Sequence, residues 1–219
     1  DDLGRQVKLP LKIERAVSLA PDLTENIFAI GGGDKLIGVT TYCNFPAEAG
    51  KIQKVGDTIN PNIETIIALK PDVVFVSTAS QIESFTNQLA QQNIAVYVTN
   101  PIGLTDVFVG LKKLGEMFGT SEKADKLVAD LQKRTSEIEQ KVQPEKRVKV
   151  FVQISKEPLF TVGGKSFLTD LIKRSGGESV TANVAEAYPK FSKETALALK
   201  PDVIILSESE DNQEPNDVF

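Results

Sequence analysis

The chain has 219 residues, of which 41% are hydrophobic and 25% charged, a composition typical of a globular protein with a substantial core. It contains no histidine, which excludes a Ser-His-Asp triad and metal sites built on imidazole, and its single cysteine excludes an internal disulfide. The net charge of −5 equals the five acidic residues within 208–219, and no basic stripe is present that would bind nucleic acid.

The first half of the chain alternates short apolar runs with amphipathic segments. Residues 15–20 predict a buried strand, and Pro21 opens a helix that Asp22 or Thr24 can cap. The glycines at 31–33 end this helix, because glycine adopts the left-handed conformation without strain. We expect further strands at 36–41, 72–77 and 94–98, and helices at 61–69, 81–92, 104–118 and 121–142.

The second half repeats this alternation. Residues 148–154 predict a strand, 158–162 a turn with a short strand, and 166–175 a helix. A loop to Tyr188 precedes a final helix and strand. Strands that alternate with helices indicate an α/β fold with mainly parallel sheets.

A repeated segment divides the chain into two similar parts. Residues 60–76 (NPNIETIIALKPDVVFV) and 188–206 (YPKFSKETALALKPDVIIL) share a glutamate, four residues, and then Leu-Lys-Pro-Asp-Val. The two copies are too far apart for a solenoid, so we predict two similar lobes. A cleft between two lobes is a favoured ligand site.

The predicted organisation is an N-terminal lobe (1–119), one long helix that joins the lobes (120–143), and a C-terminal lobe (144–219). Each lobe is expected to be Rossmann-like. The first copy of the repeat is followed by a helix, a strand and a further helix, whereas the second is followed mainly by acidic residues. We therefore expect the C-terminal lobe to be truncated.

Several motifs have structural interpretations. Gly164-Lys165-Ser166 lacks the earlier glycine that a phosphate-binding P-loop requires, because position 159 is leucine. In both repeats, Lys-Pro-Asp is expected to stop a helix and to begin the turn into a strand. Cys43 is interpreted as a small, half-buried filler rather than a catalytic thiol.

Other residues are candidates for a functional site. Glu64 and Glu194 lie in the first turns of the repeated helices, where they either stabilise the helix dipole or mark a docking surface for a basic partner. Tyr42, Phe160 and Tyr188 lie in predicted loops at strand ends, where open α/β sheets bind ligands.

Residues 16–46, 54–74 and 161–180, together with KETALALKPDVIIL, resemble the substrate-binding proteins of ABC importers. The resemblance is to the subgroup whose lobes are joined by a single helix, and it is strongest to the cobalamin-binding members. It implies that Glu64 and Glu194 dock on a permease dimer and that the long helix is a strut between the lobes. It also implies a location in the periplasm or on the extracellular face of the membrane, with a possible lipid anchor.

In the cobalamin-binding members, the ligand-facing aromatic positions match Tyr42, Phe160 and Tyr188, and two further tryptophan positions match Thr58 and Ser77. The resemblance thus implies non-covalent capture of a metal chelate, first a corrinoid and second a ferric siderophore or haem. No cofactor, catalytic residue or protein-held metal is expected. The alternative class is a two-domain α/β enzyme with its substrate in the cleft, for which Asp57, Lys156 and Glu186 are the candidate residues.

Overall fold

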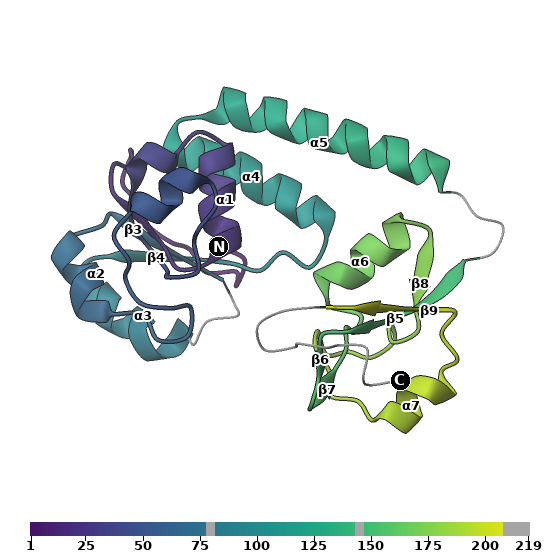
Figure 1. Cartoon of the computed structure of the whole chain (residues 1–219). Coiled ribbons are helices and arrows are strands. Elements are labelled where there is room, and N and C mark those ends of the chain that lie inside the picture. Colours follow the sequence, from purple (N-terminus) through teal and green to yellow (C-terminus); the bar gives the residue numbers. More distant parts are fainter. Residues whose placement is uncertain (78–81, 143–146, 208–219) are drawn as a thin grey trace. The chain divides into compact units, whose positions relative to one another are not determined.

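The computed structural model describes residues 1–77, 82–142 and 147–207, and of residues 82–85 it describes the backbone alone. The chain forms two units (Figure 1). Unit 1 comprises Asp1–Pro101 and Val107–Leu131, and unit 2 comprises Ile102–Asp106 and Gln132–Phe219. In the part of the chain that is described, no helix is long and apolar enough to cross a membrane.

Unit 1 is built on a four-stranded parallel sheet in the order β2-β1-β3-β4. Its strands are β1 (Ala16–Ser18), β2 (Leu36–Val39), β3 (Val73–Ser77) and β4 (Ala95–Thr99). Its shorter helices are α1 (Pro21–Ala29), η1 (Gly33–Lys35), η2 (Ala47–Lys51), α2 (Ile63–Leu69) and α3 (Ile82–Gln91). Two longer helices, α4 (Leu104–Phe118) and α5 (Ser121–Lys141), belong partly to unit 1 and partly to unit 2.

Both faces of the unit 1 sheet are covered, as a parallel sheet requires. On one face, strand residues such as Val74 and Val96 pack with Ile66 of α2 and Leu89 of α3 in an apolar cluster. On the other face, the ring of Phe75 stacks on that of Phe118 in α4, with ring centroids 5.6 Å apart. The carboxyl edge of this buried sheet is therefore a fixed base for the loops that leave it.

Unit 2 contains a three-stranded parallel sheet in the order β8-β5-β9. Its strands are β5 (Val148–Gln153), β8 (Gly177–Ser179) and β9 (Val203–Leu206), and an antiparallel hairpin, β6 (Ser155–Lys156) and β7 (Leu159–Phe160), follows β5. Helix α6 (Phe167–Arg174) packs through Ile172 on Val150 and Val152. Helix α7 (Lys193–Ala198) packs through Ala196 beside Phe151 in a second apolar cluster.

The lysine of the repeated Leu-Lys-Pro-Asp segment has the same φ in both units. Lys70 and Lys200 each have a φ of 49°, the left-handed conformation typical of a helix C-terminus. They lie at the C-terminal ends of α2 and α7.

The aspartate of each repeat anchors a neighbouring strand. The carboxylate of Asp72 accepts the N–H groups of Glu14 and Arg15, each at 2.9 Å, and that of Asp202 accepts the N–H of Lys149 at 2.9 Å. These contacts hold the chain where β1 and β5 begin. The repeat therefore has a structural role in each half, which confirms the interpretation of Lys-Pro-Asp.

Two local predictions are wrong. Helix α1 follows Ala20 without a side-chain cap. The hydroxyl of Thr24 is turned inward, 2.8 Å from that of Ser18 and 3.1 Å from the carbonyl oxygen of Ala20. The expected loop before Tyr188 contains strand β8, which has the sequence Gly-Glu-Ser and no apolar run. It forms because it pairs with β5, a long-range contact that the local sequence does not report.

Candidate functional site

In unit 1, exposed apolar side chains gather on the loops near the carboxyl edge of the sheet. Tyr42 lies in the turn after β2 and is 62% exposed, Phe45 is 65% exposed, and Ile59 is 57% exposed. The two loops that carry them are joined, because the N–H of Thr41 donates to the carbonyl of Gly56 at 2.9 Å. The structure thus places a predicted ligand-facing aromatic on a loop edge that presents apolar surface.

Thr58 and Ser77 occupy the same edge of unit 1. Thr58 is half-buried in the loop that bonds to Thr41, and Ser77 is the half-buried last residue of β3. Asp57 shapes this loop, since its carboxylate accepts the N–H groups of Asn60 at 2.6 Å and Ile59 at 2.7 Å. These backbone hydrogen bonds, with that of Asn60 the stronger, hold the pKa of Asp57 below its ordinary value. Its carboxylate therefore maintains the loop conformation, which is a structural role.

In unit 2, Phe160 and Tyr188 lie on adjacent antiparallel segments. Phe160 pairs with Lys190 in an isolated bridge, and the N–H of Thr161 donates to the carbonyl of Pro189 at 3.1 Å. Tyr188 is 54% exposed, whereas Phe160 is half-buried. The structure therefore places these two predicted aromatics on neighbouring segments of unit 2.

A glycine allows this close approach in unit 2. A Cβ atom at Gly163 would lie 2.0 Å from the backbone oxygen of Glu186, so a larger residue would displace the segment that carries Tyr188. The N–H of Gly163 donates to the carbonyl of Ala187 at 2.9 Å. The glycines around 163–164 thus serve backbone packing, which agrees with the rejection of a P-loop.

Glu64 and Glu194 occupy equivalent positions in the two units. Each is the second residue of its helix, α2 or α7, and each is exposed. The preceding caps also match: Asn62 accepts the N–H of Thr65 at 3.0 Å, and Ser192 accepts the N–H of Thr195 at 3.1 Å. Hydrogen bonds from the backbone N–H of Glu194 and from Ser192 lower the pKa of Glu194, so this carboxylate stays charged at neutral pH.

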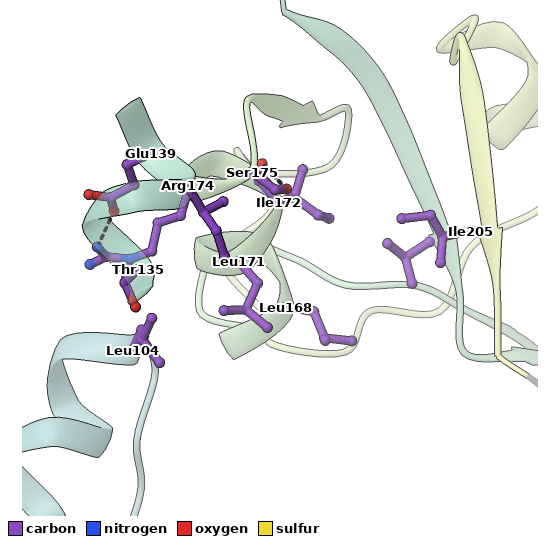
Figure 2. Close-up of a pocket in the computed structure, with 11 residues that line it drawn as sticks. Leu104, Thr135, Glu139, Leu168, Leu171, Ile172, Arg174, Ser175 and Ile205 are labelled. Atoms are coloured by element: carbon purple, nitrogen blue, oxygen red, sulfur yellow. Dashed lines mark hydrogen bonds and ion pairs between the residues drawn. The ribbon is translucent and has the colours of Figure 1, made fainter. Parts of the chain in front are cut away.

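Unit 2 also contains an apolar cavity of about 350 Å³ between α6, the end of α5 and the sheet. Figure 2 shows its lining, in which the charged pair of Arg174 and Glu139 lies on one side and Ile205 on the other. The guanidinium of Arg174 contacts the carboxylate of Glu139 at 2.7 Å and that of Asp170 at 2.8 Å, so its charge is already paired within the protein. None of the predicted ligand-facing residues lines this cavity, and we do not place the site there.

Cys43 differs from its expected environment. It is 1% exposed, and its Sγ lies 3.2 Å from the Thr24 hydroxyl and 3.0 Å from that of Thr40. The signal for this buried group in the sequence is only the succession of small polar residues after a strand. In the described part of the chain, no group of three potential metal ligands occurs.

Similarity to known proteins identifies the family of this chain. The family model described as "Periplasmic binding protein" matches residues 16–219. The chain belongs to this family. This membership confirms the predicted resemblance and fold, and the family is periplasmic, in agreement with the predicted location.

Two relatives carry vitamin B12 in their names. A vitamin B12-binding protein of Vibrio parahaemolyticus is 33% identical over 195 residues, which are 89% of this chain and 71% of that protein. The crystal structure of the periplasmic vitamin B12 binding protein BtuF of Vibrio cholerae has a TM-score of 0.82 and 28% identity, and the match covers 91% of this chain and 78% of that chain.

A second similar structure carries a different cargo in its name. A periplasmic heme binding protein from Pseudomonas aeruginosa has a TM-score of 0.78 and 24% identity, over 91% of this chain and 75% of that chain. At this identity the likeness shows the shared fold alone.

Proposed function

We propose that the chain is the substrate-binding component of an ABC importer and that it captures a corrinoid. The observation that carries this proposal is the 33% identity to a vitamin B12-binding protein across 89% of the chain. The likeness to the B12 binding protein of Vibrio cholerae supports the same cargo. We further propose that the chain binds without catalysis, as the names of these relatives suggest.

The proposed contacts with the corrinoid are non-covalent. Tyr42 in unit 1, and Phe160 and Tyr188 in unit 2, supply aromatic faces for the flat macrocycle, and the phenol groups of the tyrosines can also donate hydrogen bonds. Thr58 and Ser77 supply hydroxyl groups at the loop edge of unit 1. The exposure of Tyr42 and Tyr188 supports this role, because large aromatic side chains are usually buried when they have only a structural role.

The cargo is tested by equilibrium dialysis of the purified chain against cyanocobalamin, a ferric siderophore and haemin, each measured by its absorbance. We expect cyanocobalamin to be retained and to resist displacement by the other two. Retention of the siderophore or haemin in preference to cyanocobalamin would transfer the proposal to that chelate. Failure of a folded chain to retain any of the three would reject the capture of a metal chelate.

We also propose that Glu64 and Glu194 dock the protein on the permease dimer. Their equivalent, exposed positions at capped helix starts support this role, because one carboxylate per unit suits a two-fold partner that presents positive charge. The double variant Glu64→Ala/Glu194→Ala should lose uptake while its affinity for the ligand stays nearly unchanged. Glu122→Ala is the matched control, since Glu122 is an exposed glutamate in the first turn of α5.

Uptake into vesicles that contain the permease measures this effect. Uptake by the double variant at the rate of the control would reject the docking role, whereas a parallel loss of affinity would assign the two residues to binding instead. The role of α5 as a strut, and attachment to the membrane by a lipid, stay predictions.

A further inference from the structure

Four buried polar side chains form a continuous cluster beneath the turn that carries Tyr42. Ser18, Thr24, Thr40 and Cys43 are each between 0% and 1% exposed. The hydroxyl of Thr24 lies 2.8 Å from that of Ser18 and 3.2 Å from the sulfur of Cys43. The cluster thus connects the end of β1, the first turn of α1 and the chain that follows β2.

The turn itself is closed twice by the residues at its ends. The backbone N–H of Cys43 donates to the carbonyl of Thr40 at 3.2 Å, and the Thr40 hydroxyl lies 3.0 Å from the Cys43 sulfur. Between these two buried residues lie Thr41 and Tyr42, both exposed. Two contacts between the buried ends of the turn therefore close it, and the exposed side chain of Tyr42 lies between them.

Two further contacts hold the turn from the side of the neighbouring loop. The ammonium group of Lys54 donates to the carbonyl of Cys43 at 2.8 Å, and the N–H of Thr41 donates to the carbonyl of Gly56. Both backbone segments that flank Tyr42 are thus tied to the 54–56 segment. Because these contacts hold the backbone on both sides of Tyr42, the remaining freedom of its phenol ring is rotation about the side-chain torsions.

We propose that this cluster, through Thr40 and Cys43, positions Tyr42 for ligand capture. The inference rests on the proposed function, in which Tyr42 contacts the corrinoid. Thr40 and Cys43 are positioning residues, because their buried side chains act through Tyr42. A ligand gains affinity when the group that it contacts is already ordered, since less conformational entropy is lost on binding.

The variant Thr40→Val tests the proposal. It keeps the branched shape of the side chain and removes the hydroxyl that contacts Cys43. Thr41→Val is the matched control, because it makes the same chemical change at the exposed neighbouring residue. Cys43→Ala removes the other partner of the same contact, and it provides a second measurement if Thr40→Val does not fold.

Two measurements are made on each variant. The first is the ¹⁵N order parameter of the Tyr42 amide in the ligand-free protein, which should fall in Thr40→Val and Cys43→Ala and stay unchanged in Thr41→Val. The second is the affinity for cyanocobalamin, which should fall about three- to tenfold in the first two variants, as expected for the loss of one hydrogen bond. Unchanged order at Tyr42 in both variants would overturn the proposal.

A double variant separates positioning from a general loss of structure. In a Tyr42→Ala background, Thr40→Val should have no further effect on affinity, because the residue through which it acts is gone. A full additional loss in that background would overturn the positioning role. If the wild-type chain binds no corrinoid, the proposed function fails, and the order parameter of Tyr42 still decides whether the cluster fixes the turn.

Discussion

Arg174 is the centre of a polar network within unit 2, and replacing it should destabilise that unit. Its Nε contacts the carboxylate of Asp170 at 2.8 Å, Nη1 contacts Glu139 at 2.7 Å, and Nη2 donates to the hydroxyl of Thr105 at 3.0 Å. Asp170 also accepts the N–H of Leu104 at 2.8 Å. The network therefore joins α6 to the start of α4 and to the end of α5.

The magnitude follows from the contacts and their exposure. The side chains of Arg174 and Asp170 are 28% and 25% exposed, and that of Glu139 is 41% exposed, so water screens part of each interaction. Partly exposed ion pairs contribute about 0.2–1 kcal/mol each, so we expect Arg174→Met to lower the free energy of unfolding by about 1–2 kcal/mol. Methionine retains an apolar stem beside the cavity, which limits the loss of packing.

The pKa of Asp170 predicts how the loss of stability in Arg174→Met changes with pH. Burial alone would raise the pKa of Asp170, but hydrogen bonds from Leu104 and Arg174, together with the charges of Arg174 and Lys173, outweigh it and lower the pKa. A carboxylate with a lowered folded-state pKa contributes stability above its unfolded pKa of about 3.9, and this contribution fades as the pH falls through the folded value. The difference between wild type and Arg174→Met should therefore be constant from pH 7 to 5 and shrink below pH 4.

Urea unfolding followed by circular dichroism at several pH values measures this difference. Lys165→Met is the control, since Lys165 is an exposed lysine of unit 2 and its replacement removes the same unit of charge. A variant Arg174→Met as stable as the control at pH 7 would refute the network's contribution. A difference that persists undiminished in acid would show that the loss comes from packing and not from the ion pairs.

Three further predictions concern single side chains. Asp72→Ala should lower the free energy of unfolding by about 1–2 kcal/mol and Asp202→Ala by about half as much. Among the described residues, Asp72 accepts two backbone N–H groups and Asp202 accepts one, so equal losses in urea unfolding would contradict this. Burial raises the pKa of Asp22, so its negative charge opposes folding at pH values above its unfolded pKa. Asp22→Asn should therefore raise the melting temperature at pH 7 and have less effect at pH 4. A lower melting temperature of the variant at pH 7 would contradict this prediction. Tyr188→Ala should weaken cyanocobalamin binding about tenfold while Tyr188→Phe retains most of the affinity, and equal losses in both would assign the contribution to the phenol hydroxyl.

The sequence predicted those parts of the fold that depend on local pattern. The helix at 104–118 coincides with α4, and the helix at 121–142 exceeds α5 by one residue. Apolar periodicity defines such long helices well, since each buries a stripe of side chains. The repeat was equally informative, because a left-handed lysine, a proline and an anchoring aspartate are all local requirements of the helix-to-strand turn.

The failures lie where contacts distant in the sequence decide the structure. Strand β8 has no apolar signature, and its pairing with β5 alone makes it a strand. Asp22 or Thr24 was expected to cap α1, but the helix has no side-chain cap, and the Thr24 hydroxyl contacts Ser18 and Cys43 in the interior. The sequence could not show that these buried polar groups meet under Tyr42, because they belong to three separate segments of the chain.

For the predicted site residues, too, the local sequence predicted some features, and long-range contacts decided the others. The segments that carry Phe160 and Tyr188 lie nearly thirty positions apart in the sequence, and their proximity depends on long-range pairing. Their occurrence near strand ends was readable from the sequence, whereas their pairing was not. The exposure of Ile59 beside Thr58 was likewise invisible, since apolar residues are expected to be buried.

The central claim is tested most directly by isothermal titration calorimetry of the wild-type chain with cyanocobalamin. The account predicts saturable binding of one corrinoid per chain, and a weaker affinity at the same stoichiometry in Tyr42→Ala. An absence of saturable binding by a chain that circular dichroism shows to be folded would contradict the claim.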